Sequence, residues 1–352
     1  MTPRRVAMIV SPWYPVPPVG YGGIELMAYN LARELQLRGH QVCVIGQQGS
    51  KGPFEVAAVA PESWSDQLGT RDHQSRESLF LFRAYDLVRR RAFDVVHDHS
   101  GLPGILLGAG SRLDTPIVAT LHGDLTEAEG DFLAAVDRDV HLVAISRSQQ
   151  AQVADVNWRR VVYNAVDPAE YHPVSNVDEK EDYLFQLARI TPGKAQHLAI
   201  EVARRLGLRL VLAGKVEDEA YFEEEVKPHL GDGVKWIENV VGAEKAQLLA
   251  SARAMIFPIQ WEEPFGLAMV ESMVSGTPVI AMARGAASEL VEPGVTGFLA
   301  EDLDGLVEAY GRIGEIDLKR CVERAAKRFG PGQMADGYQS VYERAIQESY
   351  HR

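Results

Sequence analysis

Short apolar runs alternate with helical patterns along the chain, and this alternation restricts the possible folds more than any other feature. Residues 6–10 are apolar, and a helical pattern with apolar residues at positions 24, 27, 28, 31 and 35 follows them. A second apolar run, residues 42–45, comes directly after that helix. Parallel strands need a crossover between them, and a helix usually supplies it. The sequence therefore predicts a doubly wound α/β fold.

Composition excludes several classes of protein. The net charge of −13 argues against a nucleic acid or an anionic membrane surface as partner. Cys43 and Cys321 are far apart, so we expect no disulfide framework and a cytoplasmic location. We expect no transmembrane segment, because no run approaches the ~18 apolar residues that a membrane span needs. A chain of 352 residues is long enough for two domains.

Residues 259–299 contain most of the recognisable chemistry. Glu263 and Glu271 stand with seven residues between them, and a helical pattern covers residues 265–274. Pro264 suits the first position of a helix, where its missing N–H group is no loss. We therefore expect Glu263 in the loop at the helix start and Glu271 in the second turn. Gly276 is typical of the residue that ends such a helix.

This arrangement indicates a phosphorylated nucleoside as ligand. A helix N-terminus attracts phosphate through its free N–H groups, and Gly266 lets a ligand approach the backbone closely. A carboxylate further along, here Glu271, can bind the hydroxyl groups of ribose. For two glutamates at this spacing alone, an ordinary helix with exposed carboxylates is the other interpretation.

Further candidates follow the predicted strands. Arg189 and Lys194 flank a strand-to-helix turn, where two cations suit a diphosphate, although they could also be ordinary surface residues. Gly22 and Gly23 precede the first predicted helix. This pattern indicates either a loop whose backbone N–H groups bind phosphate or a flexible turn. His122 follows a predicted strand and either faces the ligand crevice or lies in an exposed loop.

Residues 97–99 are the candidates for a metal site. His97 and His99, on either side of Asp98 at the end of a predicted strand, can converge on a metal, but no third ligand stands at a recognisable spacing. We therefore expect no metal. Residues 49–72 carry no chemistry that we recognise, and we expect irregular structure there.

The string EPFG, then a glutamate, then SGTPVI and ELVEPGVTGFL resembles the donor-binding signature of the retaining family 4 glycosyltransferases, which have the GT-B fold. The signature is a glutamate pair with the spacing of Glu263 and Glu271, followed by G-x-P-V-I and E-x-V-x-x-G-x-T-G. The other matching residues are Gly276, Pro278, Glu289, Gly294, Thr296 and Gly297.

The resemblance implies two Rossmann-like domains with parallel sheets that face each other across a cleft. Residues 1–172 would form the acceptor-side domain and residues 173–335 the nucleotide-sugar-binding domain. Residues 336–352 would form a helix that crosses back to the first domain.

The resemblance also implies a function: retaining, metal-independent transfer of a sugar from a nucleoside diphosphate sugar, with a UDP-sugar favoured, to an acceptor hydroxyl. No cofactor is implied, and the acceptor is expected to be a small soluble molecule or a glycan. The implied catalytic residues are His122, Arg189, Lys194 and Glu263. The implied donor-binding residues are Gly22, Gly23, Gly214, Phe265, Gly266, Leu267 and Glu271.

Two points stay open at this stage. Ala188 and Ala195 replace the glycines that the family has around Arg189 and Lys194, which leaves the turn geometry in doubt. A sugar-nucleotide 2-epimerase of the same fold, with Asp98 and Asp124 as possible acid–base groups, and a nucleotide-sugar-binding protein without turnover are the alternative functions.

Overall fold

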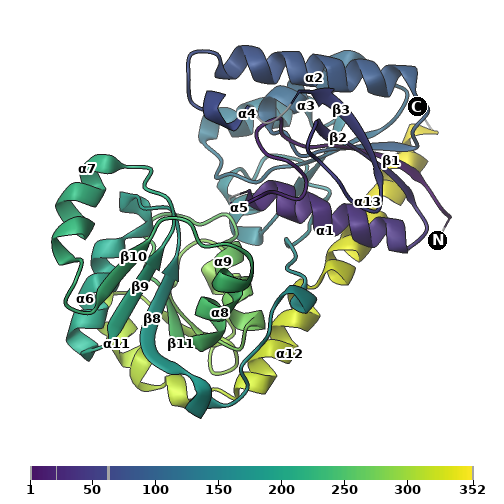
Figure 1. Cartoon of the computed structure of the whole chain (residues 1–352). Coiled ribbons are helices and arrows are strands. Elements are labelled where there is room, and N and C mark those ends of the chain that lie inside the picture. Colours follow the sequence, from purple (N-terminus) through teal and green to yellow (C-terminus); the bar gives the residue numbers. More distant parts are fainter. Residues whose placement is uncertain (1, 21, 62–63, 351–352) are drawn as a thin grey trace. The chain divides into compact units, whose positions relative to one another are not determined.

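A computed structural model describes residues 2–20, 22–61 and 64–350. Contacts between residues divide the chain into two compact units. Unit 1 consists of Met1–Ala165 and Pro331–Arg352, and unit 2 is Val166–Gly330. Each unit is an α/β structure built around its own sheet, as the strands and helices in Figure 1 show.

Unit 1 contains, among the described residues, a seven-stranded sheet in the order β3-β2-β1-β4-β5-β6-β7, and neighbouring strands are parallel. The chain builds outward from β1 in one direction and then, from β4, in the other, so β1 and β4 form the point where the strand order reverses. The strands are β1 Arg5–Ile9, β2 Gln41–Gln47, β3 Glu55–Ala60, β4 Val95–Asp98, β5 Ile117–Thr120, β6 Val140–Ala144 and β7 Arg160–Val161.

Helices cover both faces of this sheet. Successive β1 side chains point to opposite faces, so Met8 packs in a core with the first and last helices of the unit while Ala7 and Ile9 pack in a second core. Tyr338 and Tyr342 of the last helix are buried in the first of these cores. The helices are α1 Gly23–Leu37, α2 His73–Arg90, α3 Leu102–Ser111, α4 Glu127–Val136, α5 Arg147–Gln152 and α13 Pro331–Ser349.

Unit 2 repeats this plan with a six-stranded parallel sheet in the order β10-β9-β8-β11-β12-β13. The reversal point lies between β8 and β11. The strands are β8 Glu181–Leu187, β9 Arg209–Ala213, β10 Val234–Ile237, β11 Ala252–Phe257, β12 Val279–Met282 and β13 Gly297–Ala300. The helices are α6 Gln196–Leu206, α7 Glu219–Tyr221, α8 Gly242–Ser251, α9 Leu267–Val274, α10 Ala287–Leu290, α11 Leu303–Gly311 and α12 Leu318–Phe329.

Single-turn helical segments connect these elements. Most are 3-10 turns, and one is a π-helix that continues α7. They are η1 Ser65–Gln67, η2 Pro168–Glu170, η3 Val177–Glu179, η4 Pro192–Lys194, η5 Phe222–Val226, η6 Lys227–His229 and η7 Ile313–Glu315.

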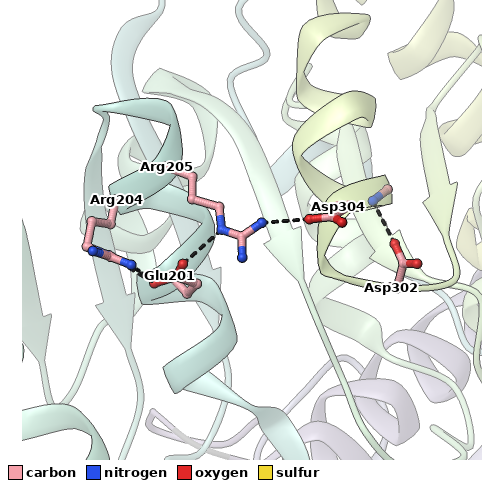
Figure 2. A network of polar contacts seen from close by, with 6 residues as sticks. Glu201, Arg204, Arg205, Asp302 and Asp304 are labelled. Atoms are coloured by element: carbon pink, nitrogen blue, oxygen red, sulfur yellow. Dashed lines mark hydrogen bonds and ion pairs between the residues drawn. The ribbon is translucent and has the colours of Figure 1, made fainter.

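A surface network joins α6 and α11 in unit 2 (Figure 2). Glu201 accepts hydrogen bonds from Arg204 and Arg205, and Arg205 also contacts Asp304 at 2.6 Å. Asp302 caps α11 by accepting from the Gly305 N–H at 2.8 Å. These side chains lie at the surface, where water screens the charges, so the ion pairs contribute little to stability.

The two parallel α/β sheets confirm the predicted fold class, but two local predictions were wrong. Residues 49–72 were expected to be irregular, yet they contain β3, which pairs with β2 at the sheet edge. Its sequence, EVAAVA, is short and rich in alanine, which is a weak strand signal. Pro264 was expected at the first helical position, but α9 begins at Leu267, because Gly266 adopts a left-handed conformation that no helix residue has.

Candidate functional site

The predicted donor-site residues of unit 2 lie in the segments after β8, β9 and β11, and β8 and β11 are the two strands at the reversal point. In open α/β sheets, ligands bind outside the carboxyl ends of the strands at such a point, because the loops there diverge and leave a crevice. Arg189 and Lys194 lie in the loop after β8, and Glu263 and Gly266 lie in the loop after β11. The topology thus brings together two sequence segments about seventy residues apart.

Lys194 and Glu263 form an ion pair, Nζ to Oε2, with side-chain exposures of only 12% and 10%. The indole N–H of Trp261 donates to the same Oε2 atom at 3.1 Å. The Lys194 ammonium also lies 4.6 Å from the centre of the Trp261 ring and 5.7 Å from that of Phe257, within cation–π range. Each of the three polar groups therefore has a defined partner, which suits a preorganised site.

The backbone around Glu263 is held by the segment after β12. The Glu263 carbonyl accepts from the Ala286 N–H at 2.8 Å. Gly285 has a φ of +54°, and a Cβ atom there would lie 2.3 Å from the Glu263 nitrogen. Only glycine permits this approach, so the GAASE segment after β12 supports the glutamate rather than merely starting the short helix α10.

The turn that carries Lys194 has alanines, Ala188 and Ala195, at the positions where glycines were expected. Ala195 adopts a left-handed conformation with φ 53° and ψ 50°, at the junction of η4 and α6. That conformation costs a non-glycine residue about 1–2 kcal/mol. The Gln186 amide donates to the Lys194 carbonyl at 2.7 Å and helps to hold this strained turn.

Gly214 lies beneath the same turn. It has a φ of +144°, and a Cβ atom there would lie 2.0 Å from the Ala188 carbonyl oxygen. The ends of β8 and β9 therefore approach as closely as they do because residue 214 has no side chain. Arg189, just beyond Ala188, forms an ion pair with Glu217, and both side chains are partly exposed.

At the start of α9, the groups available to a ligand are backbone N–H groups rather than side chains. Gly266 has a φ of +87°, and Leu267 is the first residue of the helix. The Phe265 ring is buried and packs edge-on against Phe329, with ring centres 6.3 Å apart. Its contribution to a ligand site would therefore come through its backbone.

Glu271 lies in the second turn of α9, as predicted, but its surroundings were not predicted. It is buried, and its Oε1 atom accepts from the Tyr171 hydroxyl at 2.7 Å and from the Lys245 ammonium at 2.6 Å. Burial, and then the nearby Glu271 charge, raises the pKa of Tyr171, so this hydroxyl stays protonated. Neither partner has a local sequence signal, because both come from distant segments.

In unit 1, the predicted residues lie at the carboxyl ends of β1, β4 and β5. Gly22 precedes α1 with a φ of +150°, and a Cβ atom there would lie 2.6 Å from the Pro18 Cβ. Gly23 is the first residue of α1 and is exposed. Sequence reasoning missed Glu25 in the first turn of α1, which is buried and accepts a hydrogen bond from Ser11. Burial raises the pKa of Glu25 despite that bond.

His122 follows β5 and belongs to a group of three histidines whose rings are in contact and tilted relative to one another. Its Nε2 lies 3.1 Å from the Nδ1 of His99, whose ring is 3.8 Å from that of His97. Burial lowers the pKa of His122 to about 4, so the imidazole is neutral at pH 7. The Nε2 atom of His99 is buried without a partner among the described residues.

The other side chains of residues 97–99, those of His97 and Asp98, form hydrogen bonds with neighbouring side chains and backbone. His97 contacts the Tyr342 hydroxyl at 2.6 Å and the Thr120 hydroxyl at 2.8 Å. Asp98 accepts from the Tyr85 hydroxyl at 2.6 Å and from the Ser100 N–H at 2.7 Å. In the part of the chain that the structure describes, no three His, Cys, Asp or Glu side chains are arranged to hold a metal ion.

Two parallel α/β units with charged side chains at a reversal point are typical of nucleotide-binding proteins. Comparison with known proteins identifies the family. Residues 21–170 match the model of Glycosyltransferase Family 4, and residues 167–325 match Glycosyl transferases group 1. The chain belongs to this family: it is a family 4 glycosyltransferase of the GT-B fold, an enzyme that transfers a sugar from a nucleotide sugar.

Curated relatives cover nearly the whole chain. N-acetyl-alpha-D-glucosaminyl L-malate synthase of Bacillus anthracis is 24% identical over 91% of this chain and 93% of its own length. D-inositol 3-phosphate glycosyltransferase of Mycolicibacterium smegmatis is 25% identical over 99% of this chain and 92% of its own.

Solved structures show the same fold. AviGT4, a glycosyltransferase involved in avilamycin A biosynthesis, has a TM-score of 0.76 and 27% identity, covering 98% of both chains. Sucrose-phosphate synthase from Thermosynechococcus elongatus has a TM-score of 0.80 and 18% identity, covering 98% of this chain and 100% of its own. Among the described residues, none of the helices is long and apolar enough to cross a membrane.

Proposed function

We propose that this enzyme transfers a sugar from a nucleoside diphosphate sugar, with UDP-sugars as the first candidates, to a hydroxyl of a small soluble acceptor or glycan. The proposal includes retention of configuration at the anomeric carbon and independence of metal ions. UDP is placed first because the family resemblance implies it: uridine diphosphate is the commonest nucleotide of the family's donors. The proposal is supported by the Lys194–Glu263–Trp261 cluster at the reversal point of unit 2.

Charge develops on the leaving diphosphate during transfer, and the cations of unit 2 are suited to it. Lys194 and Arg189 follow β8, and backbone N–H groups near Gly266 open α9. Positive groups held in place before the reaction stabilise the transition state without further reorganisation. Since side chains can supply this charge, a metal ion is not needed for the leaving group.

The acidic groups have separate proposed roles. Glu263 accepts from hydroxyls of the transferred sugar, and Glu271 accepts from the ribose. In the donor the sugar is attached directly to the diphosphate, so a carboxylate in contact with the phosphate-binding Lys194 is well placed for the sugar. We do not assign Glu263 as a covalent nucleophile.

For unit 1, we propose that His122 contacts the transferred sugar and that Gly22 and Gly23 offer backbone N–H groups to phosphate. The lowered pKa of His122 supports a role as a neutral hydrogen-bonding group rather than a cation.

The test is calorimetric binding of UDP, GDP, ADP and TDP and of their glucose, galactose, mannose and N-acetylglucosamine conjugates, with and without EDTA. We expect one base to bind much more tightly than the others, with an affinity that EDTA does not change. The anomer of the transferred product, assigned by NMR, tests retention. Binding of none of these nucleotides would contradict the donor site, and loss of binding in EDTA would contradict metal independence.

A further inference from the structure

Glu271 is held through one of its two carboxylate oxygens. The Tyr171 hydroxyl and the Lys245 ammonium both donate to Oε1, at 2.7 and 2.6 Å. No described residue donates a hydrogen bond to Oε2. The two donors come from different segments: Lys245 lies on α8, and Tyr171 follows η2.

This arrangement restrains the carboxylate strongly. The Glu271 side chain is 7% exposed and Tyr171 is 5% exposed, so their contact forms in a poorly hydrated environment where hydrogen bonds are stronger, whereas the Lys245 side chain is 21% exposed. Two donors from different directions on one oxygen leave the side chain few alternative rotamers. The second oxygen is then held in place as an acceptor whose hydrogen bond has to come from a ligand or from water.

We propose that Tyr171 and Lys245 are positioning residues that make the donor site specific for ribonucleotides, by fixing Glu271 so that its Oε2 atom accepts from a ribose hydroxyl. The inference rests on the proposed role of Glu271 in donor binding. It goes beyond that role because it assigns the selection of ribose over deoxyribose to two residues outside the family signature.

The expected preference for ribonucleotides over deoxyribonucleotides follows from the hydroxyl group that the deoxy form lacks. A site built to hydrogen-bond a hydroxyl group discriminates against the analogue that lacks it, because its own polar group is left without a partner. Glu271 keeps its two protein partners whether a ribonucleotide or a deoxyribonucleotide is bound. We therefore expect the deoxy form to bind about 10-fold to 100-fold more weakly, less than the largest discrimination that such sites reach.

The experiment compares the dissociation constants of each ribonucleoside diphosphate and its 2′-deoxy and 3′-deoxy counterparts, for uridine, guanosine and adenosine, by calorimetry. The wild-type protein should bind its preferred ribonucleotide at least tenfold more tightly than at least one deoxy form. Tyr171→Phe and Lys245→Met should each reduce this ratio at least threefold, because Glu271 then keeps only one of the two donors that restrain its rotamer. Lys245→Arg should preserve more of the ratio than Lys245→Met, since it retains the charge.

Matched controls come from the same unit. Tyr183 is also buried and donates its hydroxyl to α8, to the Leu248 carbonyl at 2.7 Å, so Tyr183→Phe should leave the ratio unchanged. Lys227 forms an exposed ion pair with Glu223, so Lys227→Met controls for the loss of a charge. Thermal unfolding of every variant identifies a variant that fails to fold. If Lys245→Met does not fold, the affinity ratio of Tyr171→Phe, which removes only one oxygen atom, tests the inference.

The outcomes separate this inference from the proposed function. Equal affinity of the wild type for the ribonucleotide and both deoxy forms would overturn the inference while leaving the donor site intact. An unchanged ratio in both folded variants would overturn it as well. If the wild type bound none of the ribonucleotides, the proposed donor site itself would be wrong.

Discussion

The ammonium of Lys194 contacts the carboxylate of Glu263, although the two residues were assigned to different parts of the donor. Lys194 was predicted to bind the diphosphate and Glu263 the sugar. Those two groups are covalent neighbours in a nucleotide sugar, so a single cluster can bind both. Trp261 joins the pair through its indole N–H and its ring face.

Replacing Lys194 tests the cluster first. Lys194→Met should lower kcat at least tenfold, because it removes positive charge from the leaving diphosphate. It should also lower the free energy of unfolding by about 1–3 kcal/mol, because the largely buried Glu263 loses its counter-ion. The double variant Lys194→Met/Glu263→Gln should regain the stability but not the turnover. Transfer at the wild-type rate in Lys194→Met would remove this residue from the site, and Lys227→Met serves as the control.

Trp261 should matter in two separable ways. Trp261→Phe keeps an aromatic face for Lys194 and loses only the N–H donated to Glu263, so we expect a 3-fold to 10-fold lower kcat with little change in the KM of the donor. Trp261→Ala also loses the cation–π contact, worth about 0.5–1 kcal/mol, and should raise the donor KM as well. Steady-state kinetics with varied donor measures both. If the two variants behave alike, the indole N–H has no separate function.

Gly266 should resist substitution. Its φ of +87° is strained for any residue with a side chain, and an added Cβ atom would lie 2.5 Å from the Met269 Cε. Gly266→Ala should therefore cost about 1–2 kcal/mol of unfolding free energy and weaken donor binding. Gly311, at the end of α11, has no atom within 4 Å of an added Cβ, so Gly311→Ala should be neutral or slightly stabilising. Chemical denaturation and calorimetry of the two variants provide the comparison, and equal results for both would refute the strain argument.

The folded protein should lose stability in mild acid because of His122. Its folded pKa of about 4 lies below the ordinary 6.5, so between these values the unfolded chain binds a proton here and the folded chain does not. Stability contributed by this residue is therefore present above pH 6.5 and falls as pH decreases towards 4, by up to about 2 kcal/mol between pH 7 and pH 5.

His122→Gln should lose correspondingly less stability over this interval. Urea unfolding of both proteins at pH 7 and pH 5 gives the difference, and NMR titration of the His122 ring gives its pKa directly. A ring that titrates near pH 6.5 would contradict the prediction.

Much of the fold was predictable because it depends on neighbours in the sequence. Apolar runs and helical patterns predicted a doubly wound α/β fold, and the family resemblance implied two parallel sheets. The sequence around Glu263 and Glu271 predicted a loop position for the first and a second-turn position for the second. The prediction failed where a local signal was weak, as in β3, or where one backbone angle overrode it, as at Gly266. The assigned roles of the site residues stay predictions.

The sequence by itself determined which residue types follow each strand and which helix carries Glu271. The tertiary structure alone decided that Lys194 contacts Glu263 and that Tyr171 and Lys245 hold Glu271, across separations of 69, 100 and 26 residues. Such partners are chosen by the order of strands in the sheet, which places β8 beside β11 and brings their loops together. Helical and strand periodicities describe contacts within an element, so they carry no information about which distant side chain completes a charge pair.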